Sequence, residues 1–260
     1  MTFTLLQLAF VVVVSTPLVA AGAGDEAAAL LAFKAAAISG GHGDPLASWN
    51  GSSTGGLCSW EGVTCRGSRP RQRVVALSLS SRGLAGFLSP ATGNLSSLRV
   101  LNLSSNVLSG GIPGSLGRLR HLQVLDLRNN TFAGELPANL TSCLGLTAIH
   151  LRRNQLQGRV PREVGARLVR LEVLDLRDNN LAGAIPASLA NSSSLRYLDL
   201  SDNQLEGAIP PGLGGIRGLQ NLDLAFNRLL GEPPSSLYNL SSLRASTVVD
   251  DFTSYLVMWR

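Results

Sequence analysis

The stretch Leu98–Pro113, LRVLNLSSNVLSGGIP, decides the fold of this chain. Its frame consists of four leucines, an asparagine, a glycine and an Ile-Pro pair: Leu98, Leu101, Leu103, Leu108, Asn106, Gly110, Ile112 and Pro113. The same frame returns every 24 residues, with one step of 25, through most of the chain. A unit that recurs at a fixed period of about 20–50 residues indicates a solenoid, in which each unit packs on its neighbours.

Seven such units span residues 74–242, and their first apolar positions are Val74, Leu98, Leu122, Leu146, Leu171, Leu195 and Leu219. Within each unit two apolar residues alternate with a polar one, which predicts a short strand with the apolar pair facing inward. The one extra residue lies in Val164–Arg170, on the outer side of a turn. The sequence therefore predicts an α/β solenoid with a parallel sheet on its concave face.

Asparagine recurs in six units, three residues after the second apolar residue of the predicted strand, at Asn106, Asn130, Asn154, Asn179, Asn203 and Asn227. A repeated side-chain amide can satisfy backbone groups that a turn leaves unpaired, so we expect a ladder of hydrogen bonds. Arg82 replaces asparagine in the first unit, as expected of an atypical terminal repeat. A glycine then permits a tight bend in each unit, as Gly110 does before Ile112-Pro113.

The composition excludes two classes of protein. Of the 260 residues 45% are hydrophobic, which argues against disorder. The net charge is +5 and Lys34 is the sole lysine. Because no dense basic block is interleaved with aromatic residues, the sequence does not predict a nucleic-acid partner.

Residues 1–24 contain no charged side chain, and an apolar run, Leu5–Val14, precedes the small residues Ala20–Ala23. This pattern predicts a signal peptide over residues 1–23 and hence secretion. A membrane anchor is the alternative, but the run is shorter than the ~20 residues that a span needs. Seven N-glycosylation sequons support the secretory route: Asn50, Asn94, Asn102, Asn129, Asn139, Asn191 and Asn239.

Three cysteines are present. Cys58 and Cys65 are close in sequence, and in an exported protein such a pair predicts a disulfide. Cys143 occupies the position that Leu119 and Leu168 fill in other units, so we expect a buried thiol acting as a small hydrophobe.

Residues 24–73 form a distinct N-terminal segment. Asp25–Ile38, DEAAALLAFKAAAI, predicts a helix with Leu30, Leu31 and Phe33 facing inward. The segments DPLASWN and CSWEGVTC follow, the second bracketing a Trp with two cysteines. Asp25–Cys65 resembles the N-terminal cap of plant leucine-rich-repeat receptors, a cap that would shield the first core layer from water.

The Gly-x-Ile-Pro element of the units resembles the plant-specific class of leucine-rich repeats, over residues 25–244. The chain is thus similar to the ectodomain of a plant leucine-rich-repeat receptor-like kinase. The resemblance implies extra short strands on one flank. It also implies recognition of a peptide or microbial ligand outside the cell, in immunity or development, with a co-receptor kinase as a possible partner. We expect an apoplastic protein, or one at the plasma membrane as part of a longer receptor.

Residues 243–260 depart from the frame, and no kinase motif or apolar span follows the repeats in this sequence. We interpret the chain as a truncated or alternatively spliced product. A secreted inhibitor of fungal pectin-degrading enzymes is the alternative function, since such plant proteins share this repeat type. Their paired C-terminal cysteines are missing here.

Columns of equivalent positions on the concave face supply the candidate ligand-binding residues: Arg128, His150, Arg152, Arg153, Asp175, Arg177, Tyr197 and Asp199. One interpretation is a lattice of solvated ion pairs. The functional interpretation is an anchor for a carboxylate or sulfate on an extended peptide, because arginine offers a bidentate fork. His150 could make recognition sensitive to pH. A glycan on Asn102, on the same face, would direct a partner toward later units.

The sequence does not predict an enzyme. It lacks a Ser/His/Asp arrangement, metal-ligand spacing and a phosphate loop, so no metal or cofactor is expected. A row of carboxylates at Asp126, Asp175, Asp199 and Asp223 suggests glycosidase chemistry at first. Because the row repeats regularly through the array, we expect solvent-facing scaffold residues instead.

Overall fold

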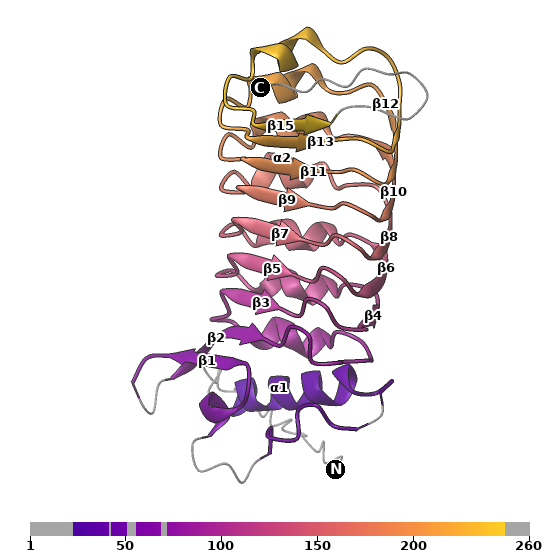
Figure 1. Cartoon of the computed structure of the whole chain (residues 1–260). Coiled ribbons are helices and arrows are strands. Elements are labelled where there is room, and N and C mark those ends of the chain that lie inside the picture. The colour runs from indigo at the N-terminus through magenta and orange to yellow at the C-terminus, as the bar shows by residue number, and fades with distance from the viewer. Residues whose placement is uncertain (1–22, 42, 51–55, 69–71, 248–260) are drawn as a thin grey trace, which may run out of the picture.

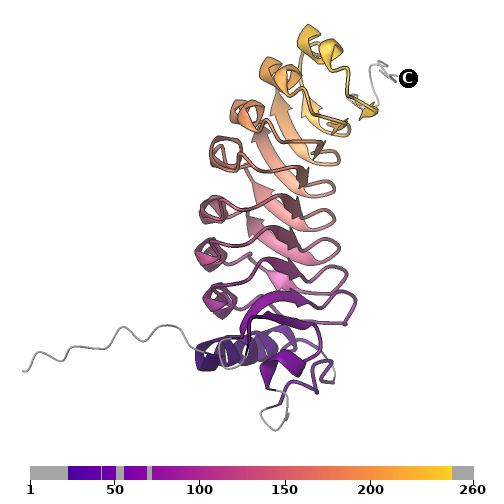
Figure 2. The same ribbon diagram turned by 90° about the vertical axis from the view of Figure 1, so that its left-hand side faces the viewer.

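The computed structural model describes residues 23–41, 43–50, 56–68 and 72–247. The units stack into one elongated solenoid, with helix α1 (Ala23–Ala37) at the N-terminal end (Figure 1). Seen from the side, the stack curves, with the turn helices along one edge (Figure 2). The predicted signal peptide lies outside the described residues apart from Ala23, and so do residues 248–260 of the divergent tail.

A nine-stranded sheet forms the concave face, and its order is β1-β2-β3-β5-β7-β9-β11-β13-β15. All its pairs are parallel except that of β1 with β2, and equivalent residues of successive units are register partners. The strands are β1 (Val63–Arg66), β2 (Arg73–Ser78), β3 (Val100–Asn102), β5 (Val124–Asp126), β7 (Ala148–His150), β9 (Val173–Asp175), β11 (Tyr197–Asp199), β13 (Asn221–Asp223) and β15 (Ala245–Thr247).

The predicted extra strands form a second parallel sheet of six strands on one flank. Its members are β4 (Ser109–Gly110), β6 (Thr131–Glu135), β8 (Gln155–Gly158), β10 (Asn180–Ala184), β12 (Gln204–Gly207) and β14 (Arg228–Leu229). The bend glycine of each unit from Gly110 to Gly231 has a positive φ, 74° at Gly110, which a residue with a Cβ rarely adopts. Glycine therefore recurs in the frame at this position.

Short helices on the convex side return the chain to the next strand. Six are five-residue 3-10 turns: Pro90–Asn94, Gly114–Arg118, Ala138–Ser142, Ala187–Asn191, Pro211–Gly215 and Ser235–Asn239. The extra residue converts one turn into the α-helical α2 (Glu163–Arg167), where the Leu168 amide donates to the Val164 carbonyl four residues back. In the preceding unit the Cys143 amide donates to Leu140, three residues back. The extra residue therefore lies in the segment that the sequence predicted, Val164–Arg170.

The core is a continuous stack of leucines, and the asparagine ladder is confirmed. Asn106 accepts the amides of Arg82 and Leu84 through Oδ1 and donates through Nδ2 to the carbonyls of Leu79 and Leu103. The amide of each ladder asparagine therefore joins its own unit to the preceding one. Arg82, which replaces asparagine in the first unit, instead forms an ion pair with Glu61 of the cap at 2.7 Å.

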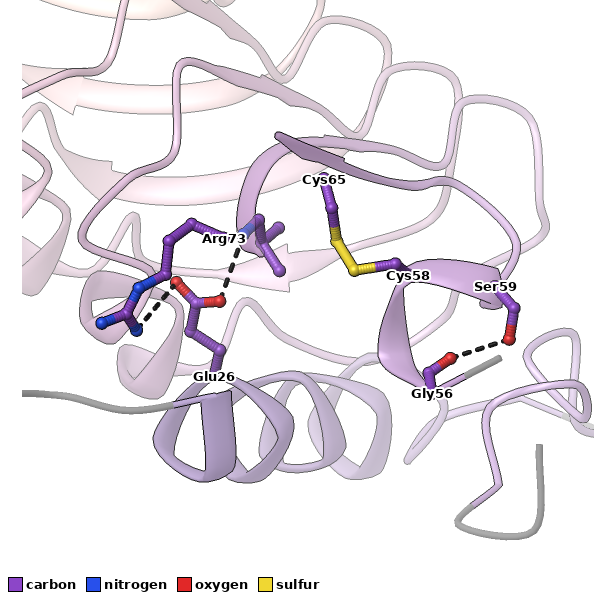
Figure 3. Close-up of a disulfide and its surroundings, with 7 residues drawn as sticks. Glu26, Gly56, Cys58, Ser59, Cys65 and Arg73 are labelled. Atoms are coloured by element: carbon purple, nitrogen blue, oxygen red, sulfur yellow. Dashed lines mark hydrogen bonds and ion pairs between the residues drawn. A yellow bond between two sulfur atoms is a disulfide. The ribbon is translucent and has the colours of Figure 1, made fainter. Parts of the chain in front are cut away.

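The cap is closed by aromatic stacking and a disulfide. Trp49 stacks on Trp60 with ring centroids 5.4 Å apart, and Phe33 lies 6.0 Å from Trp49. A short 3-10 turn in the cap, Leu57–Ser59, carries Cys58, which pairs with Cys65 as predicted (Figure 3). The prediction for Leu31 is wrong, since this side chain is 44% exposed. Leu30 and Phe33 fill the inward stripe of α1, and Leu31 lies about 100° away from Leu30 around the helix.

Glu26 connects the cap to the first repeat, a role that the sequence did not reveal. Its side chain is buried, and its Oε2 accepts the backbone amide of Val74, the first core residue of the array, at 3.1 Å (Figure 3). Arg73 lies 3.8 Å from the other carboxylate oxygen. Burial raises the pKa of Glu26, although the Val74 amide and the Arg73 charge oppose that shift.

We expect Glu26→Ala to destabilise the chain by about 2 kcal/mol, because the buried Val74 amide loses its acceptor. Glu26→Gln keeps an acceptor and removes a buried charge. Since the folded pKa is raised, the glutamate favours folding most below its unfolded pKa, and this contribution is lost as pH rises through the folded pKa. Urea unfolding should therefore show the stability of Glu26→Gln relative to wild type increasing from about pH 4 to pH 7. A constant difference would contradict this.

Within the described residues, no helix is long and apolar enough to cross a bilayer.

Candidate ligand-binding face

Three columns of side chains cover the concave face, in the register that the sequence predicted. The first column follows the strand pairing and consists of Ser78, Asn102, Asp126, His150, Asp175, Asp199 and Asp223. The second consists of Ser80, Ser104, Arg128, Arg152, Arg177, Ser201 and Ala225, and the third of Ser81, Ser105, Asn129, Arg153, Asp178, Asp202 and Phe226. Backbone hydrogen bonds link the third column of one unit to the second of the next, as from the Asp178 amide to the Ser201 carbonyl.

Three of the four aspartates of the first column are not the solvent-facing residues that the sequence predicted, whereas Asp223 is half-buried. Asp126, Asp175 and Asp199 are only 4–5% exposed. In each, Oδ1 accepts the backbone amide two residues later, as Asp199 does from Ser201 at 3.1 Å. These carboxylates close a local turn at the end of the strand, and the neighbouring long side chains cover them. They have a structural role in the turn, so they do not support the glycosidase interpretation.

The arginines form loose ion pairs along the middle of the face. Arg128 lies 3.4 Å from Asp126, Arg152 lies 3.9 Å from Asp175, and Arg177 lies 3.2 Å from Asp202 of the next unit. All three pairs are longer than the 2.7–2.9 Å of a charge-assisted hydrogen bond. Their side chains are 37–46% exposed. The guanidinium groups therefore lie near carboxylates but keep N–H donors that these carboxylates do not use. They can bind an anionic ligand.

The other candidates lie at the rim or deeper in this face. Arg153 pairs with Asp178 at 3.7 Å, and both side chains are about 60% exposed. His150 Nδ1 lies 3.9 Å from the Asp175 carboxylate. The Tyr197 hydroxyl donates to Asp199 Oδ2 at 3.0 Å, and burial together with the nearby Asp199 carboxylate raises the pKa of Tyr197. Tyr197 and Asp199 therefore brace each other, and they are less available to a ligand than the arginines.

Phe226 is the large apolar side chain of the third column, and the sequence analysis did not single it out as a candidate ligand contact. It ends the third column, is 51% exposed and has a φ of 55°. The other described members of that column share this left-handed conformation, and most are Ser, Asn or Asp, which adopt it at lower cost than an aromatic residue. A phenylalanine in a frame position usually taken by a small polar residue was the available signal.

The predicted sequons separate into two groups. Asn94, Asn139, Asn191 and Asn239 lie on the convex turn helices and are exposed. Asn50, in the cap, is exposed as well. Asn102 and Asn129 lie on the concave face, half-buried: Asn102 accepts from Ser104, and Asn129 Nδ2 donates to Ser105 Oγ at 3.2 Å.

Cys143 is fully buried, as predicted, and its thiol donates to the Leu116 carbonyl at 3.2 Å. Burial raises the pKa of this thiol to about 11, so it is a poor nucleophile at neutral pH. In the part of the chain that the structure describes, His, Cys, Asp and Glu side chains form no group of three placed to hold a metal ion.

Family comparisons agree with this architecture. Residues 23–66 match the leucine rich repeat N-terminal domain family. Residues 72–132 and 145–205 match the leucine rich repeat family, and residues 218–240 match a further leucine rich repeat family. The matched families therefore cover the cap and most of the array.

A curated relative is the receptor kinase-like protein Xa21 of Oryza sativa subsp. japonica. It is 52% identical over 81 residues, which are 30% of this chain and 8% of the relative. The chain thus spans only a small part of the receptor kinase that it matches.

Two solved structures place the chain among plant receptor ectodomains. The ectodomain of the receptor kinase GASSHO1/SCHENGEN3 from Arabidopsis thaliana, in complex with CASPARIAN STRIP INTEGRITY FACTOR 2, is 36% identical with a TM-score of 0.70. That match covers 84% of this chain and 29% of that one. A chain of the BIR3–SERK2 complex from Arabidopsis thaliana is 31% identical with a TM-score of 0.53, over 80% of this chain and 96% of that one.

Proposed function

Because this chain belongs to the leucine-rich-repeat proteins and is homologous to the ectodomains of plant receptor kinases, we propose that it recognises an extended peptide outside the cell. The ligand would lie along the concave face, across the strands. One observation carries the proposal: Arg128, Arg152 and Arg177 form a row of partly exposed guanidinium groups whose ion pairs are loose. Such a row can bind a carboxylate or sulfate of the peptide.

The extracellular location rests on several features that agree. The apolar leader, the Cys58–Cys65 disulfide and the exposed sequons all suit an exported glycoprotein. Plasma-membrane location would follow if the chain is part of a longer receptor, as in its receptor-kinase relatives. Roles in defence or development, and a second receptor ectodomain as partner, are extensions by homology. The BIR3–SERK2 structure shows that one similar ectodomain occurs in such a complex.

Glycans would leave most of the concave face open. We expect mass spectrometry of plant-expressed protein to find glycans at Asn94, Asn139, Asn191 and Asn239, because their side chains are exposed on the convex turns. Asn102 and Asn129 should carry less, since hydrogen bonds and neighbouring strands restrict them. Full occupancy at Asn129 would place a glycan among the arginines and contradict the proposed ligand path.

The arginine row can be tested without a known ligand. A displayed library of random peptides is first selected on the wild-type protein, and the enriched peptide is used as the probe. We expect Arg128→Ala/Arg152→Ala/Arg177→Ala to weaken its binding by at least about tenfold, since each charge-assisted hydrogen bond contributes about 1.5–3 kcal/mol. Calorimetry or anisotropy titration would measure the change.

The matched control replaces three exposed arginines elsewhere, Arg118, Arg167 and Arg217, and it should bind normally. The concave variant should fold, because the ladder uses the backbone carbonyls of Arg128, Arg152 and Arg177 rather than their side chains. Equal affinity of wild type and the concave variant would overturn the proposal.

A further inference from the structure

The three columns of the concave face carry opposite charges in different units. The unit of β7 contributes Arg152 and Arg153, with no carboxylate in its columns. The units of β11 and β13 contribute Asp199, Asp202 and Asp223, with no arginine or lysine in their columns. The unit of β9 lies between them and carries both signs. The face is therefore bipolar: we call the β7 part the basic pole and the β11–β13 part the acidic pole.

The acidic pole is incompletely neutralised by the protein itself. Among the described residues, no arginine, lysine or histidine nitrogen lies within 4.0 Å of the Asp199 or Asp223 carboxylate. Asp202 has a loose partner in Arg177, at 3.2 Å, with both side chains more than a third exposed. Burial and the neighbouring Asp199 and Asp202 carboxylates raise the pKa of Asp223, against the opposing effects of the Ala225 amide and Arg177. A cationic group placed here would relieve the repulsion between these carboxylates.

Phe226 adds an exposed apolar surface to the unit that carries Asp223. It follows Asp202 in the third column, and the Asn203 amide donates to its carbonyl at 3.1 Å, which fixes the two units side by side. With half of its surface exposed, the ring can lie under the aliphatic stem or the charged end of an arginine or lysine. The acidic pole therefore combines negative charge with an exposed aromatic ring.

The separation of the poles defines the ligand. Three strand steps lead from β7 through β9 and β11 to β13, which is about 14 Å at a strand spacing of about 4.8 Å. An extended chain advances about 3.4 Å per residue, so about four residues cover that distance.

We propose that the concave face selects a bipolar peptide, which places an anionic group over Arg152 and Arg153 and a basic side chain over Asp202, Asp223 and Phe226, about four residues away. This inference rests on the proposed function, peptide recognition by the concave face. It adds a second contact to the arginine row: the acidic pole binds a positively charged side chain of the peptide.

Two capped heptapeptides of the same composition test the inference. In Glu-Glu-Gly-Ser-Gly-Arg-Arg the nearest opposite charges are four residues apart, whereas in Glu-Arg-Arg-Glu-Gly-Ser-Gly no two opposite charges are more than two residues apart. We expect the bipolar peptide to bind at least tenfold more tightly in low salt, and the difference to shrink as salt screens the charges. Equal affinities, or no binding of the bipolar peptide at millimolar concentration, would overturn the inference.

Variants of each pole should remove the preference. Asp202→Asn/Asp223→Asn/Phe226→Ser removes the proposed contacts of the acidic pole and leaves only the buried Asp199 carboxylate there. Asparagine at 223 can still accept the Ala225 amide that Asp223 binds at 3.1 Å. Both this variant and Arg152→Gln/Arg153→Gln should bind the two heptapeptides equally. The matched control Glu206→Gln/Glu232→Gln/Leu230→Ser makes the same kinds of change at exposed positions of the flank and should keep the wild-type preference.

The two proposals fail differently. If the library-selected peptide depends on the arginine row but the heptapeptides bind equally, the proposed function stands and the bipolar inference falls. If the acidic-pole variant keeps the wild-type preference for the bipolar peptide, the basic contact is not made at Asp202, Asp223 and Phe226, and the inference is overturned.

Discussion

Asn154→Ala is expected to lower the free energy of unfolding by about 3 kcal/mol, because several buried backbone groups lose their partners at once. Asn154 Oδ1 accepts the Phe132 amide at 3.0 Å. Its Nδ2 donates to the carbonyls of Leu127 and Leu151, at 3.1 and 2.9 Å. The side chain therefore joins two neighbouring units near the middle of the array.

Urea unfolding followed by circular dichroism would measure this loss. Asn154→Asp should be as harmful as the alanine variant, because it keeps an acceptor but turns a second oxygen toward carbonyls that need a donor. The control is Asn180→Ala, an exposed asparagine at the start of β10, which should change stability by less than about 0.5 kcal/mol. A small effect of Asn154→Ala would show that the ladder is not a principal connection between units.

Gly214→Ala is expected to destabilise the chain by about 2 kcal/mol, the usual cost of overpacking a rigid contact. A Cβ at Gly214 would overlap the backbone of Ser236 in the next turn helix, so the two turns would have to separate. Backbone atoms of neighbouring turns block a Cβ at Gly93, Gly117 and Gly165 in the same way. Glycine at this position therefore sets the spacing of the convex side.

The adjacent residue supplies a control in the same helix. A Cβ at Gly215 would meet no atom within 4 Å, so Gly215→Ala should leave stability within about 0.5 kcal/mol of wild type. Thermal and urea unfolding of the two variants would distinguish the steric effect of a Cβ from the general effect of replacing a glycine. If both variants had the same stability, the close approach of the turns at Gly214 would not explain why glycine is required there.

The sequence predicted the repeated part of the structure well. The leucine frame, the ladder of Asn106 and its equivalents and the bend glycines were all confirmed, because a period of 24 residues gives each position the same environment many times. The extra residue near α2 was placed correctly for the same reason: the frame resumes at Leu171.

Predictions failed where burial depends on neighbours rather than on the period. Asp175 alternates with inward leucines and so appeared solvent-facing, but its strand-end turn and the adjacent long side chains bury it. Glu26 lies in the first turn of a helix, a usual place for an exposed acid, yet its partner Val74 is 48 residues away in sequence. The close approach at Gly214 likewise depends on the packing of adjacent units.

In the candidate site, too, the features set by the repeat were predictable and those set by contacts between units were not. The sequence identified the columns and the arginine row, since these positions vary while the frame is constant. It did not identify the acidic pole as a separate feature. The pairing of Arg177 with Asp202 across two units is visible only in three dimensions, as is the lack of such a partner for Asp223 among the described residues.

Hydrogen–deuterium exchange of the complex with a library-selected peptide tests the central claim most directly. If the concave face is the recognition surface, the peptide should protect backbone amides in and just after β5, β7, β9, β11 and β13. The convex turn helices and the flanking six-stranded sheet should exchange as in the free protein. Protection confined to the turn helices or to the flanking sheet, with the concave strands unchanged, would contradict the account.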